Sequence, residues 1–252
     1  MIGIVGGVGP YAGLDLAKNI FDNTLAETDQ DHLDLIMLSA SSTISDRTEY
    51  LMGRDPQNPA RAMLNVLIKM EASGATVAGI PCNTAHASEI FDEILSGLAA
   101  KQSRLNLLNM VDETIKEIKI QFPLVNCVGI LSTTGTYQFQ VYAKPLQDAG
   151  FKVVVPDFET QENRVHAAIY DRNYGIKAKS NPITDRAQKD LRSVAGLLIK
   201  EGAELIIKGC TEIVLAIPEK ELYGIPTVDP SIVLARSLIQ HIASKKLKHK
   251  NL

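Results

Sequence analysis

The chain has 252 residues, of which 45% are hydrophobic and 22% are charged, a composition typical of a folded globular protein rather than a disordered or fibrous one. Its 26 basic and 29 acidic residues give a formal net charge of −3, so no overall basic field exists to hold a nucleic acid. The apolar stretches are shorter than the roughly 20 residues of a membrane-spanning helix, and no charged leader precedes the first of them. We therefore expect a cytoplasmic protein without nucleic-acid or membrane partners.

Short runs rich in valine and isoleucine alternate with longer amphipathic segments, which predicts an α/β fold with parallel strands joined by crossover helices. One helical segment is Ala60 to Ser73, where apolar residues recur at steps of three and four and Gly74 is placed to end the helix. We predict eight strands: Ile2–Val5, Leu33–Leu38, Thr76–Ile80, Asn106–Met110, Cys127–Leu131, Lys152–Val155, Leu205–Ile207 and Ile225–Val228.

The three cysteines are too few, and odd in number, for a disulfide framework, so we expect free thiols. Cys127 lies inside an apolar run, as a small buried hydrophobic residue does. Cys82 and Cys210 each follow a predicted strand and precede small polar residues. This repeated pattern predicts two similar α/β halves, each with a cysteine at the carboxyl end of a strand, where open parallel sheets place their ligand sites. We expect a cleft between the halves to bring the two thiols together.

A glycine-rich segment, Gly6-Gly7-Val8-Gly9-Pro10, follows the first strand and loosely matches the dinucleotide-binding fingerprint. A dinucleotide site also needs an acidic residue after the second strand to hold the ribose, and serines and an alanine stand there instead. We favour a tight turn whose backbone N–H groups line an anionic pocket, with Pro10 at the first position of a helix.

Three chemistries could use the cysteines. A hydrolase pairing Cys82 with His86 would leave Cys210 unexplained. A zinc site from the same three residues lacks any Cys-x-x-Cys or His-x-x-x-His pair, so we expect no metal. Two thiols on opposite walls of a cleft suit inversion at a stereocentre, because a thiolate removes a proton from one face and a thiol returns it to the other.

The segments Pro81-Cys82-Asn83-Thr84-Ala85-His86 and Gly209-Cys210-Thr211-Glu212-Ile213 resemble the two signature segments of the aspartate/glutamate racemases, which work without pyridoxal phosphate. The resemblance covers nearly the whole chain, with departures at Val8, Ser45 and Lys208. Further segments occur in the family's order: Gly6 to Pro10, Asp46-Arg47-Thr48, Thr133-Thr134-Gly135-Thr136, Ile169-Tyr170 and Tyr174 to Ala178.

The resemblance implies two pseudo-symmetric domains with an amino acid between them, the first formed by residues 1–113 and 229–252 and the second by residues 114–228. It implies that Cys82 and Cys210 are the two bases, that no cofactor is needed and that the protein is a homodimer. Arg47 and Lys177 are then candidates to bind the carboxylate of an acidic side chain. The candidate donors to the α-carboxylate are Asn83, Thr84, Thr133, Thr136 and Thr211, and the candidate orienting residues are Asp46 and Glu212.

Two lysine-containing features have alternative interpretations. Lys208 lies two residues before Cys210 on the same strand face, so it either depresses the pKa of that thiol or reaches solvent. The basic tail Ser244 to Lys250 is interpreted as a solvated helix end rather than an interaction patch.

The leading hypothesis is a racemase of aspartate and/or glutamate. The alternatives are a lyase or isomerase on the same scaffold, such as a malonate decarboxylase or a maleate isomerase, and a protein that binds an acidic amino acid without turnover. The decarboxylases need only one cysteine, so two cysteines weigh against them.

Overall fold

The computed structural model describes residues 1–249, and contacts along the chain divide it into two compact units. The first unit combines Met1–Glu113 with the segment from Ser231 onward, and the second unit is Thr114–Pro230. Each unit has its own parallel sheet with helices, which confirms the predicted α/β fold class. No helix within residues 1–249 is long and apolar enough to cross a membrane.

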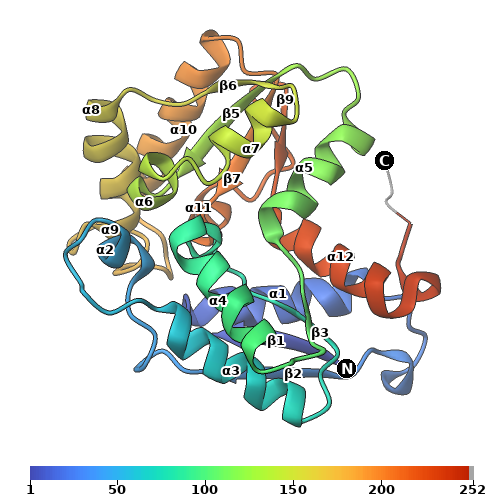
Figure 1. Ribbon diagram of the computed structural model, residues 1–252. Coiled ribbons are helices and arrows are strands. Elements are labelled where there is room, and N and C mark those ends of the chain that lie inside the picture. Colours follow the sequence, from blue (N-terminus) through green and yellow to red (C-terminus); the bar gives the residue numbers. More distant parts are fainter. Residues whose placement is uncertain (250–252) are drawn as a thin grey trace. The chain divides into compact units, whose positions relative to one another are not determined.

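The first unit contains a four-stranded sheet in the order β2-β1-β3-β4, in which every neighbouring pair is parallel. Figure 1 shows β1 between its two neighbours. The strands are β1 (Ile2–Gly6), β2 (Leu35–Ser39), β3 (Val77–Gly79) and β4 (Asn106–Leu107). The helices of this unit are α1 (Pro10–Asn23), α2 (Arg47–Leu51), η2 (Asn83–His86), α3 (Ala60–Ala72), α4 (Ser88–Ala100), α12 (Pro230–Ala243) and the short turns η1 (Asp29–Asp31) and η4 (Ser244–Lys246).

Alternate residues of β1 contact different helices on the two faces of this sheet. Ile2 and Ile4 belong to a buried apolar cluster with side chains of α1 and α12. Gly3 points to the other face, where an added Cβ would lie 3.3 Å from the sulfur of Met70 in α3. Because successive strand residues face opposite sides, α1 and α12 cover one face of the sheet and α3 covers the other.

The second unit contains a five-stranded sheet in the order β6-β5-β7-β9-β8, parallel except for the β8–β9 hairpin. Helix α10 (Asp185–Lys200) covers one face, with Val194 and Leu198 in the same core cluster as Ile206 of β7. The strands are β5 (Cys127–Ser132), β6 (Lys152–Val154), β7 (Leu205–Gly209), β8 (Glu221–Leu222) and β9 (Ile225–Val228). The other helices are α5 (Met110–Gln121), which runs across the unit boundary, α6 (Thr134–Gln138), α7 (Ala143–Asp148), α8 (Phe158–Thr160), the π-helix η3 (Gln161–His166), α9 (Ala167–Tyr170) and α11 (Thr211–Ala216).

The two sheets have the same strand order over four positions. The order β2-β1-β3-β4 in the first unit corresponds to β6-β5-β7-β9 in the second, with the same parallel pairing throughout. Strand β3 therefore corresponds to β7. These are the strands that precede Cys82 and Cys210.

Most predicted strands agree with the structure within two residues, but three expectations were wrong. The strand predicted to reach Met110 ends at Leu107, because the Asn109 side chain caps α5 by accepting a hydrogen bond from Val111 N (2.9 Å). The two-residue strand β8 was missed. Cys127 is half-buried at the amino end of β5 rather than enclosed in the core.

The basic tail is bound to the first unit, as far as the structure describes it. Leu247 forms an antiparallel bridge with Thr24, and Lys248 Nζ donates to the carbonyl of Asp22 at the end of α1 (2.8 Å). Lys246 Nζ donates to the carbonyl of Asp31. The expectation of a solvated helix end therefore holds for the exposed Lys245 and His249 but not for Lys246 and Lys248, and Lys250 lies outside the described residues.

Candidate active site

Cys82 stands where strand β3 gives way to a short helix. Pro81 has no N–H to continue a strand ladder, and Cys82 is the N-cap of η2 in an extended conformation (φ −150°, ψ 109°). The thiol-bearing residue is half-buried, whereas Asn83 and Thr84 of η2 are buried. The first unit thus presents one cysteine with two polar neighbours on a single turn.

His86 supports this turn and is not a base for the thiol. Its Nδ1 donates to the carbonyl oxygen of Cys82 (2.9 Å), and its ring stacks on Phe91 with centroids 4.9 Å apart. Burial lowers the pKa of His86 to about 4, so the ring is neutral at physiological pH. The geometry therefore disfavours the hydrolase pairing of Cys82 with His86.

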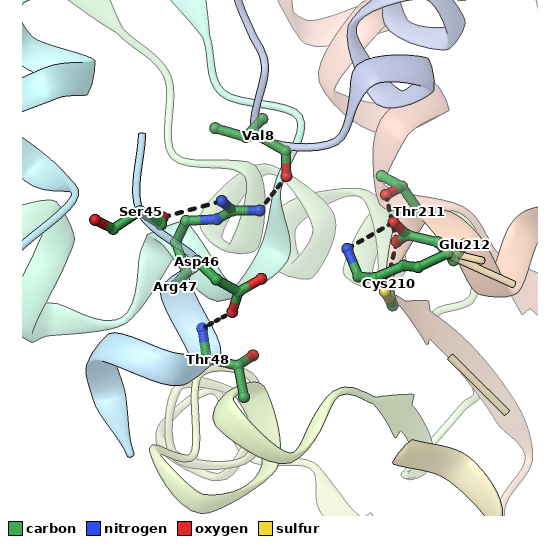
Figure 2. A network of polar contacts seen from close by, with 9 residues as sticks. Val8, Ser45, Asp46, Arg47, Thr48, Cys210, Thr211 and Glu212 are labelled. Atoms are coloured by element: carbon green, nitrogen blue, oxygen red, sulfur yellow. Dashed lines mark hydrogen bonds and ion pairs between the residues drawn. The ribbon is translucent and has the colours of Figure 1, made fainter. Parts of the chain in front are cut away.

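Arg47 is a nearly buried cation at the start of α2, with 7% of its surface exposed. Asp46 is the N-cap of this helix, and its Oδ1 accepts hydrogen bonds from the backbone N–H groups of Thr48 (2.8 Å) and Glu49 (3.0 Å). The Arg47 guanidinium donates to the carbonyl of Ser45 (3.1 Å) and to that of Val8, as Figure 2 shows. Asp46 thus orients the helix turn that carries Arg47.

The glycine-rich segment supplies one of these carbonyls. Gly7 has φ +85°, and a Cβ there would lie 2.5 Å from the backbone nitrogen of Ser41, which is a steric clash between non-bonded atoms. Only glycine therefore fits this turn. The turn directs the Val8 carbonyl to Arg47, so the segment positions a side chain of the candidate site.

In the second unit, Cys210 is the N-cap of α11 and is 6% exposed. Its backbone is extended (φ −154°, ψ 136°), as at Cys82. The thiol donates to Glu212 Oε2 with an Sγ–Oε2 distance of 2.9 Å, and the hydroxyl of Thr211 donates to the same oxygen at 3.0 Å. Figure 2 shows the three side chains converging at the first turn of α11.

Lys177 completes this cluster from a loop after α9. Its Nζ lies 2.9 Å from Glu212 Oε1, and the side chains of Lys177 and Glu212 are 28% and 15% exposed. The ammonium also lies 5.0 Å from the ring centroid of Tyr170, and His166 stacks on the same ring. The spacing of Tyr170 from Lys177 in the sequence does not indicate this contact, and only the family resemblance includes both residues.

The charges of this cluster follow from its geometry. Burial raises the pKa of the Cys210 thiol well above its ordinary value, and the negative charge of Glu212 raises it further while Lys177 opposes the change. Burial would raise the pKa of Glu212, but Lys177 and the donated hydrogen bonds outweigh it and lower the pKa to about 2. The resting state is a neutral thiol beside an ion pair.

Thr133 and Thr136 lie at the carboxyl end of β5. Thr133 is the N-cap of α6, and its Oγ1 accepts from Thr136 N (3.3 Å) and donates to Thr136 Oγ1 (3.2 Å). Both threonines are buried. Thr134 donates to Glu162 of the π-helix, a contact between residues 28 positions apart that no local sequence pattern indicates.

Lys208 takes neither of its two expected places. Its side chain is buried, and its Nζ donates to the carbonyls of Ile217 (3.1 Å) and Glu219 (3.3 Å) beyond the end of α11. It therefore neither reaches solvent nor contributes to the pKa of Cys210, whose charged neighbours are Glu212 and Lys177. Within residues 1–249, no three histidine, cysteine or acidic side chains are grouped to hold a metal ion.

Each unit therefore assembles part of the predicted site. The first unit holds Cys82, Asn83 and Thr84 on one turn and Asp46 and Arg47 on another. The second unit joins Lys177, Cys210, Thr211 and Glu212 through hydrogen bonds, and holds Thr133 and Thr136 at the neighbouring strand end.

In both units a cysteine follows the corresponding strand of a parallel sheet and occupies the N-cap of the next short helix. A family model described as Asp/Glu/Hydantoin racemase matches residues 5–238, and the chain belongs to this family.

Relatives match over almost the full chain. The broad specificity amino-acid racemase RacX of Bacillus subtilis (strain 168) is 28% identical over 245 residues, covering 95% of this chain and 96% of that protein. The structure of the Picrophilus torridus aspartate racemase is 28% identical, covers 98% of this chain and 95% of that chain, and superposes with a TM-score of 0.79. A structure of a putative Asp/Glu racemase from Yersinia pestis, 24% identical and covering 95% and 97%, shares the fold with a TM-score of 0.75.

Proposed function

We propose that the protein is an amino-acid racemase that interconverts the L and D forms of aspartate and/or glutamate without pyridoxal phosphate, by two-base proton transfer between Cys82 and Cys210. The observation that carries the proposal is the equivalence of the two cysteines. Each follows the corresponding strand of its sheet, and each caps a short helix with an extended backbone. Family membership supports the racemase activity.

The chemistry requires a base and an acid on opposite faces of the α-carbon. For one enantiomer, the Cys82 thiolate takes the α-proton and the Cys210 thiol donates its own proton to the other face. For the opposite enantiomer, the Cys210 thiolate is the base. Burial and Glu212 raise the pKa of this thiol, and the Lys177 ammonium partly offsets that rise. Glu212 orients the Sγ–H bond in the resting state.

The carbanion must be stabilised for a free amino acid to lose its α-proton. Hydrogen bonds to the α-carboxylate do this most directly as it takes up charge, and we assign this role to Asn83, Thr84, Thr133, Thr136 and Thr211. Each donor that acts like an oxyanion-hole group contributes about 3 to 4 kcal/mol at the transition state.

Each unit offers one cation for the carboxylate of an acidic side chain. Arg47 is buried with its guanidinium held by backbone carbonyls, and Lys177 is partly exposed in the second unit. We assign these two residues to the distal carboxylate of the substrate. The name of the Picrophilus torridus enzyme agrees with an acidic substrate, whereas the name of RacX points to a wider range, so the test below compares several amino acids.

We also propose that the protein is a homodimer. Tyr11 and Leu14 lie about one turn apart on α1 and are 63% and 54% exposed. A second copy of the chain would cover these two side chains. Light scattering should give twice the chain mass for the wild type and a smaller mass for Leu14→Glu; a monomeric wild type would refute this assembly.

The decisive experiment incubates each enantiomer of aspartate, glutamate and alanine with the protein in D2O. Racemisation should incorporate deuterium at the α-carbon and abolish optical activity, fastest for an acidic amino acid. Cys82→Ala and Cys210→Ala should each lower the rate by about 10²- to 10⁴-fold, the usual contribution of a positioned acid or base.

Cys127→Ala is the matched control, because Cys127 lies at the opposite end of β5 from the threonines of the site. This variant should keep the wild-type rate. Full racemisation by Cys82→Ala would overturn the two-base assignment. Tight binding of an acidic amino acid without deuterium incorporation would instead identify a binding protein.

A further inference from the structure

Two cations hold the carboxyl-terminal end of the short helix that begins at Cys210. Lys208 Nζ donates to the carbonyls of Ile217 and Glu219, and Arg192 Nη2 of α10 donates to the carbonyl of Ala216 (3.3 Å). Arg192 also binds the Glu219 carboxylate at 2.6 Å. The end of α11 is therefore fixed both to its own strand and to the neighbouring helix.

Because α11 is short, the contacts at its carboxyl-terminal end contribute much of what fixes its backbone. The helix has six residues, and the last four carbonyls of any α-helix lack a partner within the helix. In α11 the carbonyl of Ile213 accepts from Ile217 N (2.8 Å) and that of Ala216 accepts from Arg192, and positive charge at this end also complements the helix dipole. Ile213 and Ala216 bury their side chains in the core of the second unit, and Lys208 and Arg192 add the hydrogen bonds that fix the backbone where the helix ends.

Lys208 links the end of α11 to the strand that carries the cysteine. Its side chain leaves β7 two residues before Cys210 and is buried along its length. Cys210 lies between β7 and α11 in the chain. The Lys208 side chain connects β7 to the backbone just beyond α11, so it links the segments on both sides of Cys210. Burial lowers the pKa of Lys208, and the nearby carboxylates of Asp229 and Glu219 oppose this change.

We propose that Lys208, together with Arg192, is a positioning residue that fixes Cys210 and Glu212 by anchoring the far end of α11. The proposal rests on the function proposed above, in which Cys210 is one of the two bases. Lys208 acts through the helix rather than through its charge, because the charges that act on the thiol are those of Glu212 and Lys177.

The test measures how fast iodoacetamide alkylates each cysteine of the same protein, read by mass spectrometry. Lys208→Met removes the ammonium and keeps an aliphatic side chain. Because two hydrogen bonds from a buried amine are lost, we expect Cys210 to react about tenfold faster or more. Cys82 in the first unit and Cys127 at the other end of the second sheet are internal controls and should keep their wild-type rates.

Lys200→Met is the matched control variant, because Lys200 is an exposed lysine at the end of α10. It should leave all three alkylation rates unchanged. Arg192→Met provides a second variant in case Lys208→Met does not fold, and it should raise the Cys210 rate in the same direction. In the racemase assay, both test variants should lower kcat/KM by about tenfold or more, because Cys210 and the substrate-binding Thr211 both lie at the start of α11.

The experiment distinguishes a failure of the positioning role from a failure of the proposed racemase function. If Lys208→Met and Arg192→Met leave the Cys210 alkylation rate at the wild-type value, or if all three cysteines change together, the positioning role is overturned. If the wild type does not racemise any amino acid but the selective change at Cys210 occurs, the proposed function fails while the anchoring of α11 stands.

Discussion

The thiol of Cys210 donates a hydrogen bond to the carboxylate of Glu212, with 2.9 Å between Sγ and Oε2. The same carboxylate is paired with Lys177 through its other oxygen. The neutral thiol of Cys210 is therefore hydrogen-bonded to a carboxylate whose negative charge is already paired with the Lys177 ammonium. This relationship makes the protonation of Cys210 depend on Glu212, two residues further along the chain, and on Lys177, which is distant in sequence.

Glu212→Gln should lower the pKa of Cys210. The substitution removes a negative charge that raises this pKa and leaves the positive charge of Lys177 without its partner. The pH dependence of Cys210 alkylation, followed by mass spectrometry, should shift to lower pH. Loss of the oriented thiol should also reduce kcat by about 10- to 100-fold. An unchanged alkylation profile would show that Glu212 does not control the thiol.

Lys177→Met should remove a pH-dependent part of the stability. The folded-state pKa of Glu212 is about 2 against an ordinary value of 4.5, so the carboxylate stabilises the fold above pH 4.5 and this contribution is lost as the pH falls towards 2. At neutral pH the variant should be less stable by about 3 kcal/mol. Urea unfolding should show this difference shrinking on acidification below pH 4.5. A difference that stays constant with pH would contradict the ion-pair explanation.

Arg47→Lys should impair acidic substrates selectively. A lysine keeps the charge but loses the planar guanidinium that can bind a carboxylate through two parallel hydrogen bonds. We expect KM for aspartate or glutamate to rise by about 10- to 100-fold. Alanine, which has no side-chain carboxylate, is the control substrate, and its kcat/KM should change little. Equal losses for all three amino acids would assign Arg47 to the shape of the site rather than to specificity.

Gly7→Ala should destabilise the first unit more than a glycine substitution in open space. Gly7 and Gly150 both have positive φ, +85° and +96°, but only at Gly7 would a Cβ meet neighbouring backbone. Gly150→Ala should cost about 1 kcal/mol for the backbone conformation alone. Gly7→Ala should cost about 2 kcal/mol more, measured by urea unfolding, and should raise KM because the Val8 carbonyl that binds Arg47 moves. Equal costs would show that the turn accommodates a side chain.

Much of the fold could be predicted because its signals are local. The strand Ile225–Val228 was predicted with its observed bounds, and Gly74, with φ +98°, follows the end of α3 as expected. Strand β8 could not be predicted because two residues are too few to show the alternation of apolar and polar side chains that marks a strand. The turn that follows it, at Tyr223 and Gly224, has positive φ at both positions. The division into one domain of residues 1–113 and 229–252 and a second of residues 114–228 stays a prediction.

The site was predictable only in part. The cysteines could be found because each follows an apolar strand and precedes polar residues. The contact between Lys177 and Glu212 joins residues 35 positions apart, and the place of Lys208 depends on which way a long side chain turns at the end of β7. Such contacts arise from tertiary packing, which the composition of the chain and the spacing of its residues do not predict.

Helix α12 packs on β1 and β3 of the first unit, although the whole second unit separates them in the chain. Leu234 and Leu238 fill the space over Gly79. During synthesis from the amino terminus, the ribosome must therefore translate the second unit before it produces the helix that closes the core of the first. The nascent chain carries an incomplete apolar sheet face through that interval, which makes the middle of translation its period of greatest exposure to misassembly.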